Sequence, residues 1–171
     1  PFFVYLAFNA VHAPLQAEKE DLAKFAHLKG KRKSLAAMAW AMDKACGQVF
    51  DKLKELGLDK NTIIVFTNDN GGPNGTETSN YPLSGMKATL ISYPGVIKKG
   101  SHYNKPTSFL DFLPAFINLA GYDKEIANPL DGVDIIPYLT GKNNGRPHQT
   151  LYWKIENRGV VRDGDWKFMR F

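Results

Sequence analysis

The sequence has 171 residues, of which 43% are hydrophobic, and a formal net charge of +5. This length predicts roughly one domain with its own core, and no apolar run is long enough to span a membrane. The single cysteine excludes an internal disulfide bond. The densest basic stretch, residues 29–33, holds a glycine and no aromatic residue. It predicts a solvated loop before a helix rather than a nucleic-acid patch.

The chain opens with an apolar run. Residues 2–8 read FFVYLAF, a pattern typical of a buried strand without strict alternation. The sequence starts at Pro1, with no initiator Met, charged n-region or signal cleavage site before the run. We therefore expect this sequence to be a piece of a longer protein.

His12 follows this predicted strand. Pro14 pushes Ala13 towards an extended conformation, so a helix does not start there. His12 is thus expected on a loop at the carboxyl end of the strand. A lone loop histidine is most often a surface residue, and His12 becomes a functional candidate only through its expected neighbours.

Two helices are predicted next. Residues 18–28 form a short charged helix, and Ser34 can cap a long one that ends at Gly57. Cys46 is expected inside the long helix as a small buried side chain rather than a nucleophile. With the strand that follows, the pattern is a βαβ unit with a right-handed crossover. The apolar stripe of the long helix consists of Leu35, Met38, Met42, Ala45, Val49, Leu53 and Leu56.

The next strand ends in polar residues and glycines. Residues 62–72 read TIIVFTNDNGG, and the apolar half suits a parallel strand that is covered on both faces. Ligands of open α/β sheets bind beyond the carboxyl ends of the strands. The adjacent oxygen donors of Asp69 and Asn70 suit Ca²⁺ or Mg²⁺. The alternative is a simple Asx–Gly turn that binds no ligand.

Lys87 lies in the stretch PLSGMK, directly after a glycine turn. Such a lysine is ordinarily a surface residue. Near an anion site, its ammonium could bind an oxyanion as a point charge. Asn74 opens a formal glycosylation sequon, which we expect to be unused because it lies close to the predicted site.

The remaining chain predicts fewer strands of the first kind. Residues 88–93 form a weak strand, and Ser108 or Asp111 can cap a helix that ends at Gly121. Residues 130–139 predict a loop and a short helix. Three antiparallel strands follow at 150–155, 159–162 and 166–171.

The predicted fold class is α/β, with a mostly parallel sheet flanked by helices and then the start of a small antiparallel C-terminal sheet. Residues 1–145 are predicted to belong to the α/β domain. Residues 146–171 are predicted to begin the antiparallel subdomain.

A series of motifs runs through nearly the whole chain in a fixed order. It begins with FFVYLAFNAVHAPLQ and DKLKELGLDKNTIIVFTNDNGG, continues with PLSGMK, YPGVIKKG, SFLDFLP and LDGVDIIPYLTG, and ends with LYW and VRDGDWKF. The series resembles the sulfatase family, the arylsulfatase-like branch of the alkaline-phosphatase superfamily. The resemblance implies an alkaline-phosphatase-like fold, of which this chain is the C-terminal part of the catalytic domain, and the hydrolysis of sulfate monoesters.

The resemblance also implies roles for four residues. Asp69 and Asn70 match the pair that ligates the active-site divalent cation, usually calcium, although magnesium also fits. Lys87 matches the lysine that holds the sulfate group. His12 matches the histidine of the His-x-Pro element, which contacts the sulfate and the leaving oxygen. A cation, an ammonium and an imidazole would together stabilise charge that develops on the bridging oxygen.

The nucleophile of the family has no counterpart in this chain. In the family it is a formylglycine made from the Cys or Ser of a Cys/Ser-x-Pro-x-Arg motif, and Cys46 does not match that motif. The aspartates that complete the cation site are also absent. We expect these residues upstream of Pro1, and we expect the chain alone to be inactive.

The segment after Lys87 is shorter than in the family. The usual Gly-Gly-x-Arg-x-Pro segment is missing, and Leu90 runs almost directly into Ile91-Ser92-Tyr93. Two interpretations remain open. A natural deletion of roughly ten residues would leave this strand poorly paired, whereas a mobile loop outside the printed sequence would not.

Two other functions remain open at this stage. One is a phosphonate or phosphate ester hydrolase of the same superfamily, and the other is a catalytically inactive sulfatase-like binding protein. The resemblance implies a sulfated small molecule or a carbohydrate sulfate as the substrate. It also implies an exported protein, periplasmic or secreted, or lysosomal in a eukaryote.

Overall fold

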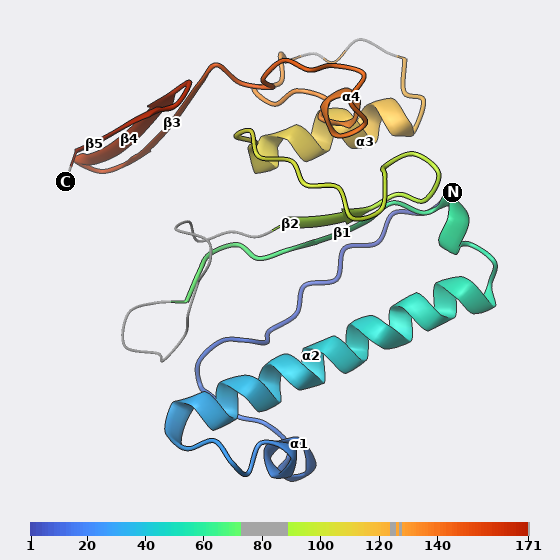
Figure 1. Ribbon diagram of the computed structural model, residues 1–171, viewed down its shortest axis with the longest axis vertical. Coiled ribbons are helices and arrows are strands. Elements are labelled where there is room, and N and C mark those ends of the chain that lie inside the picture. The colour runs from blue at the N-terminus through green and yellow to red at the C-terminus, as the bar shows by residue number, and fades with distance from the viewer. Residues whose placement is uncertain (73–88, 124–125, 127, 171) are drawn as a thin grey trace. The chain divides into compact units, whose positions relative to one another are not determined.

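The computed structural model describes residues 1–72, 89–123, 126 and 128–170 (Figure 1). The chain divides into two compact units, Pro1–Gly95 and Val96–Phe171, each described here by itself. The boundary predicted between residues 145 and 146 stays a prediction. Among the described residues, no helix combines the length and the apolar character needed to cross a membrane.

The first unit contains two helices, α1 (Lys19–Lys24) and α2 (Gly30–Glu55). Helix α2 begins before the predicted Ser34 cap, and its N-cap is Lys29. The loop predicted for residues 29–33 is therefore wrong, because lysine and arginine favour the helix and extend it towards the N-terminus. Gly57 ends the helix as predicted, with a φ of 66° that costs a glycine little.

Charged side chains join α1 to α2. The Asp21 carboxylate is buried and accepts a hydrogen bond from the Lys44 ammonium at 2.9 Å. The Lys24 ammonium lies 5.4 Å from the ring centroid of Trp40, within the range of a cation–π contact. These contacts fix the short helix α1, which is too short to be stable by itself.

A short 3-10 helix, η1 (Asp59–Asn61), leads into strand β1 (Ile64–Thr67), which pairs with β2 (Thr89–Ser92). The pairing is antiparallel and joins Ile64 to Ser92 and Thr67 to Thr89. Strand β2 pairs through Leu90 and Ile91 along its whole length. The shortened segment therefore does not leave this strand poorly paired.

The strand predicted at residues 2–8 is not assigned as a strand in the described part of the chain. The segment is extended and exposed, and Tyr5 retains 82% of its accessible surface. All strand pairs among the described residues are antiparallel, so the predicted βαβ unit is not formed there. The physical reason is that a strand needs a hydrogen-bonded neighbour, and none of the described strands pairs with this segment.

The second unit begins with a 3-10 helix, η2 (Phe109–Asp111), that continues into α3 (Phe112–Leu119). Ser108 and Asp111 form a capping box, which confirms both predicted caps. Gly121 follows the helix with a φ of 68°. The predicted short helix is α4 (Ile136–Leu139).

The unit ends in a three-stranded antiparallel sheet of β3 (Thr150–Ile155), β4 (Arg158–Asp163) and β5 (Trp166–Arg170). These strands confirm the antiparallel C-terminal sheet. Two-residue turns join them, and a residue with positive φ lies in each turn, Glu156 at 52° and Gly164 at 55°. Turns of this kind match the right-handed twist of the flanking strands.

Candidate functional site

The predicted cation ligands lie directly after β1. The strand ends at Thr67, and the chain then places Asp69 and Asn70 in exposed positions while Gly71 is buried. The buried glycine anchors the backbone on the far side of the pair. The two polar side chains are thus held at the end of a strand and remain accessible to a ligand.

Local hydrogen bonds decide which atoms of this segment can bind a cation. The Asn68 side-chain amide donates to the carbonyl of Asn70, and the Asn70 amide nitrogen donates to the carbonyl of Gly71 at 2.8 Å. These bonds orient the Asn70 amide group and leave its Oδ1 as the atom that can ligate. No described residue donates a hydrogen bond to the Asp69 carboxylate. Two adjacent oxygen donors fit part of a Ca²⁺ shell, which takes six to eight oxygen ligands.

His12 lies on an exposed loop, as predicted. Its Nδ1 lies 2.8 Å from the carbonyl oxygen of Ala13. A carbonyl can only accept, so Nδ1 carries the proton and Nε2 is the nitrogen that faces a ligand. The peptide bonds Ala10–Val11 and Ala13–Pro14 on either side are cis.

The described contacts do not join these positions into one cluster. Among the residues that the structure describes, no hydrogen bond or ion pair links His12 to Asp69 or Asn70. The same residues contain no group of three or more His, Cys, Asp or Glu side chains that could hold a metal ion. Lys87 lies outside the described residues.

A second polar cluster, in the other unit, was only half predicted. Asp111 is fully buried, and its carboxylate accepts hydrogen bonds from three donors. These are the backbone N–H of Ser108 at 2.7 Å, the backbone N–H of Val133 at 3.0 Å and Nε2 of His148 at 2.7 Å. The capping pattern identified Asp111, but no local pattern points to His148, which lies 37 residues further along the chain.

The Asp111 cluster is chemically closed. Each carboxylate oxygen has a donor, and the carboxylate ties the start of α3 to the segment before α4 and to the entry of β3. Burial raises the pKa of the Tyr103 hydroxyl, with smaller contributions from Tyr138 and Asp111. The Tyr103 Oη is buried and has no hydrogen-bond partner. We therefore assign this cluster a structural role.

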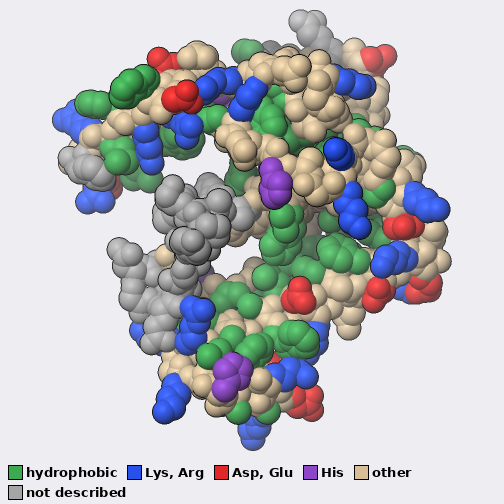
Figure 2. Space-filling model, in the orientation of Figure 1, with side chains coloured by type: hydrophobic (Ala, Val, Ile, Leu, Met, Phe, Trp, Pro, Cys, Tyr) green, Lys and Arg blue, Asp and Glu red, His purple; other side chains and the backbone are tan. Residues whose placement is uncertain are grey.

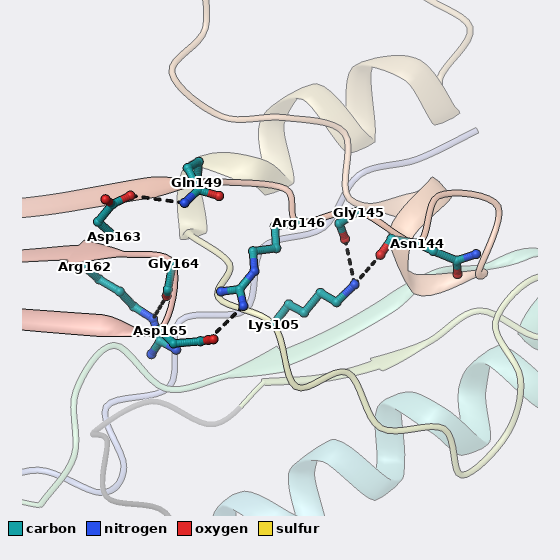
Figure 3. A network of polar contacts seen from close by, with 9 residues as sticks. All are labelled: Lys105, Asn144, Gly145, Arg146, Gln149, Arg162, Asp163, Gly164 and Asp165. Atoms are coloured by element: carbon teal, nitrogen blue, oxygen red, sulfur yellow. Dashed lines mark hydrogen bonds and ion pairs between the residues drawn. The ribbon is translucent and has the colours of Figure 1, made fainter.

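Basic residues of the second unit also hold loops together (Figure 3). The Lys105 ammonium contacts the carbonyls of Asn144 and Gly145, the latter at 3.0 Å. Arg146 donates to the carboxylate of Asp165 at 2.8 Å. This hydrogen bond, together with the charge of Arg146, lowers the pKa of Asp165. The contacts explain these cations without an anionic ligand.

Comparison with known proteins follows from the whole chain. The family model described as Sulfatase matches residues 1–122. The chain is 31% identical over 166 residues to the uncharacterized sulfatase YdeN of Escherichia coli, covering 90% of this chain and 30% of the relative. It is 32% identical over 200 residues to the steryl-sulfatase of Rattus norvegicus, covering 100% of this chain and 33% of the relative. The chain thus spans about a third of the length of these curated relatives.

Solved structures show the same similarity in three dimensions. The crystal structure of Ps i-CgsB in complex with k-i-k-neocarrahexaose superposes with a TM-score of 0.91 at 34% identity, covering 100% of this chain and 41% of that one. A protein in complex with its substrate D-glucosamine-2-N,6-O-disulfate gives a TM-score of 0.65 at 24% identity, covering 90% of this chain and 36% of that one. The second comparison shows the fold alone. Together with the antiparallel C-terminal sheet, these neighbours confirm the predicted fold class.

Proposed function

Because the chain belongs to the sulfatase family, we propose that residues 1–171 form part of an enzyme that hydrolyses sulfate monoesters. The observation that carries this proposal is the end of β1. There the adjacent oxygen donors of Asp69 and Asn70 are exposed beside the buried Gly71. Asp69 and Asn70 are the residues that match the cation-binding pair of the family.

We propose that Asp69 and Asn70 supply part of the coordination shell of a divalent cation, most simply Ca²⁺. The chemistry of the donors supports this choice, since a carboxylate and a carboxamide oxygen are hard ligands. A bound cation would supply electrostatic stabilisation for the oxygen atoms of the sulfate group. Asp69 contributes negative charge, while Asn70 contributes a neutral oxygen whose direction is set by its bond to Gly71.

His12 is proposed to act on the leaving oxygen. With its Nδ1 donating to Ala13, Nε2 can donate a hydrogen bond or a proton to that oxygen when the imidazole is protonated. Lys87, which lies outside the described residues, is proposed to bind the sulfate as a point charge. The two groups would bind and orient the ester and offset charge as the S–O bond breaks.

The nucleophile is proposed to come from outside residues 1–171. Cys46 is a free cysteine in the middle of α2, far from any motif that resembles the modified cysteine of the family. We propose that a formylglycine of the complete protein fills this role. Residues 1–171 alone would then be inactive.

The proposed substrate is a carbohydrate sulfate. Support comes from the structural relative at 34% identity, whose title gives it in complex with neocarrahexaose. The similarity covers the whole of this chain, which makes an oligosaccharide a better first substrate than a small aryl or steroid ester.

The test is a turnover measurement on the full-length protein that contains this chain. We expect release of inorganic sulfate from a sulfated galactan oligosaccharide or an aryl sulfate, and a loss of activity with EDTA that Ca²⁺ restores. Faster turnover of the matching aryl phosphate would make the protein a phosphate ester hydrolase instead. Oligosaccharide binding without turnover of either ester would make it a binding protein.

A further inference from the structure

Residues 2–8 have one face on α2 and one face exposed. Leu6 and Phe8 line an apolar groove together with Ala45, Val49 and Leu53 of α2. The alternate side chains point away from it, and Tyr5 is the most exposed residue of the segment. Figure 2 shows hydrophobic side chains reaching the surface beside α2. Alternation of this kind is the property of a strand that lies on a helix.

Helix α2 lines a second apolar groove with the sheet of the same unit. Trp40, Met42 and Cys46 face Ile64 and Phe66 across it, and the groove has a volume of about 640 Å³. One helix therefore serves two extended segments, residues 2–8 and β1. The described residues pair β1 with β2 only.

The spacing of the two grooves on α2 indicates how far apart these segments run. At 3.6 residues per turn, the helix residues of the first groove and those of the second are centred roughly 130° apart. On a helix about 10 Å wide this angle corresponds to a separation of about 9 Å. Neighbouring strands lie about 4.8 Å apart, so two strand spacings fill the same distance.

We propose that one further strand of the same polypeptide, from outside residues 1–171, inserts between residues 2–8 and β1. The occupant is argued from three observations: the apolar segment is extended and exposed, the spacing leaves room for one strand, and the relatives are about three times as long as this chain. The structural relative matches the whole of this chain with only 41% of its own length. The inserted strand would run beside β1, whose end carries Asp69 and Asn70.

This inference rests on the part of the proposed function in which residues 1–171 belong to a longer protein. It does not depend on sulfatase activity. The test is amide hydrogen exchange in the full-length protein, read at single residues. An antiparallel partner on one side protects only every second amide of a strand, and a partner on the other side protects the rest.

We expect slow exchange at three consecutive amides of each segment, Val4–Leu6 and Ile64–Phe66, at least about 100-fold slower than in an unfolded chain. Alternating fast and slow exchange in 64–66, or fast exchange throughout 4–6, would overturn the proposal. Amides in the middle of α2 serve as the control, since they exchange slowly in either case if the unit is folded.

Direct pairing of residues 2–8 with β1 would also protect both segments, so a second measurement separates the two arrangements. In a Cys46→Ala background, Tyr5→Cys is combined in turn with Ile64→Cys, Val65→Cys and Phe66→Cys. Directly paired strands bring one of these pairs within about 5.5 Å, close enough for a disulfide. We expect no disulfide on oxidation, because an inserted strand keeps the pairs about 9.6 Å apart. A disulfide formed in high yield would contradict the insertion.

Discussion

Two aspartates of this chain, Asp69 and Asp111, show opposite uses of the same side chain. Asp69 is exposed at the end of β1, and no described residue donates a hydrogen bond to it. Asp111 is fully buried at the start of a helix and accepts from Ser108, Val133 and His148. A buried carboxylate must be paired by its own protein, whereas an exposed one at a strand end is left for a ligand.

The difference separates stability from function in the two regions. Substitution of Asp111 should change the free energy of unfolding, because its partners stay behind in the interior without an acceptor. Substitution of Asp69 should change activity and leave folding intact. The predictions below test this separation in the full-length protein, starting with the largest effect.

Asp111→Asn should lower the free energy of unfolding by about 3–5 kcal/mol, because it breaks a buried charged pair and turns an amide towards three donors. Urea denaturation followed by the fluorescence of Trp153 and Trp166 measures the effect. The matched control is Asp165→Asn, whose carboxylate is exposed, and its unfolding midpoint should not move. Equal midpoints for the two variants would remove the distinction between the aspartates.

Asp69→Asn should reduce sulfate release by at least about 100-fold, since the loss of an outer-shell group alone costs 10- to 100-fold. Its free energy of unfolding should stay within about 0.5 kcal/mol of the parent value. Asp59→Asn, an exposed substitution in η1 of the same unit, should leave both quantities unchanged. Full activity of Asp69→Asn would exclude a cation role for this residue.

Gly132→Ala tests how closely the chain packs around Asp111. A Cβ at this position would lie 2.0 Å from the carbonyl oxygen of Leu110, so the backbone must move, at a cost of about 1–3 kcal/mol. Gly47→Ala is the control, because nothing lies within 4 Å of its Cβ position in the middle of α2. There the exchange should stabilise by up to about 1 kcal/mol. The two thermal midpoints should therefore move in opposite directions.

Tyr103→Phe should stabilise the protein by about 1 kcal/mol, because it removes a buried hydroxyl that has no hydrogen-bond partner. The pKa of this hydroxyl is raised in the folded state, so its contribution is present below the pKa of the unfolded chain and is lost as the pH rises through the folded pKa. The parent should thus lose stability above about pH 10. Thermal melts from pH 8 to 11 should show a smaller alkaline loss for the variant, and identical slopes would argue against a buried hydroxyl.

Arg146→Gln should have the smallest effect. Its guanidinium lowers the pKa of Asp165, so the pair adds stability above the unfolded pKa and loses it as the pH falls through the folded pKa. Because Asp165 is exposed, solvent screens the pair and the unfolding midpoint should hardly change. The carboxyl carbon of Asp165, followed by NMR, should titrate at higher pH in the variant. An unchanged titration would show that the ion pair does not persist in solution.

Local rules predicted much of the fold. The capping box of Ser108 and Asp111, the helix end at Gly57 and the turn at Gly164 each depend on a few adjacent residues, and the structure confirms them. Strand β1 follows from its apolar composition. These features need no information from distant parts of the chain.

Features that depend on distant partners could not be predicted in this way. Residues 2–8 have the composition of a strand, yet pairing requires a neighbour that their sequence does not specify. His148 contacts Asp111 across 37 residues, and nothing adjacent to it marks the contact. The cap at Ser34 failed for another reason, since the basic residues before it can themselves continue the helix.

The candidate site follows the same division. The order of polar residues after β1 predicted where Asp69 and Asn70 lie, and His12 is on its expected loop. The roles of these three residues and of Lys87 stay predictions. A cation shell needs ligands from several segments, so a pattern of neighbouring residues identifies only its local part.

The pairing of Thr67 with Thr89 has a consequence for the evolution of this protein. The two threonines face each other in the ladder, and their hydroxyl groups are 2.9 Å apart. Chain inserted or deleted between these fixed points leaves the register of β1 and β2 unchanged, and doubling a loop costs only about 0.6 kcal/mol of closure entropy. The rat steryl-sulfatase aligns with this chain over 200 residues, which shows that relatives differ in length. Lineages could therefore diversify the segment between Thr67 and Thr89 while they inherit Asp69 and Asn70 at the same strand end.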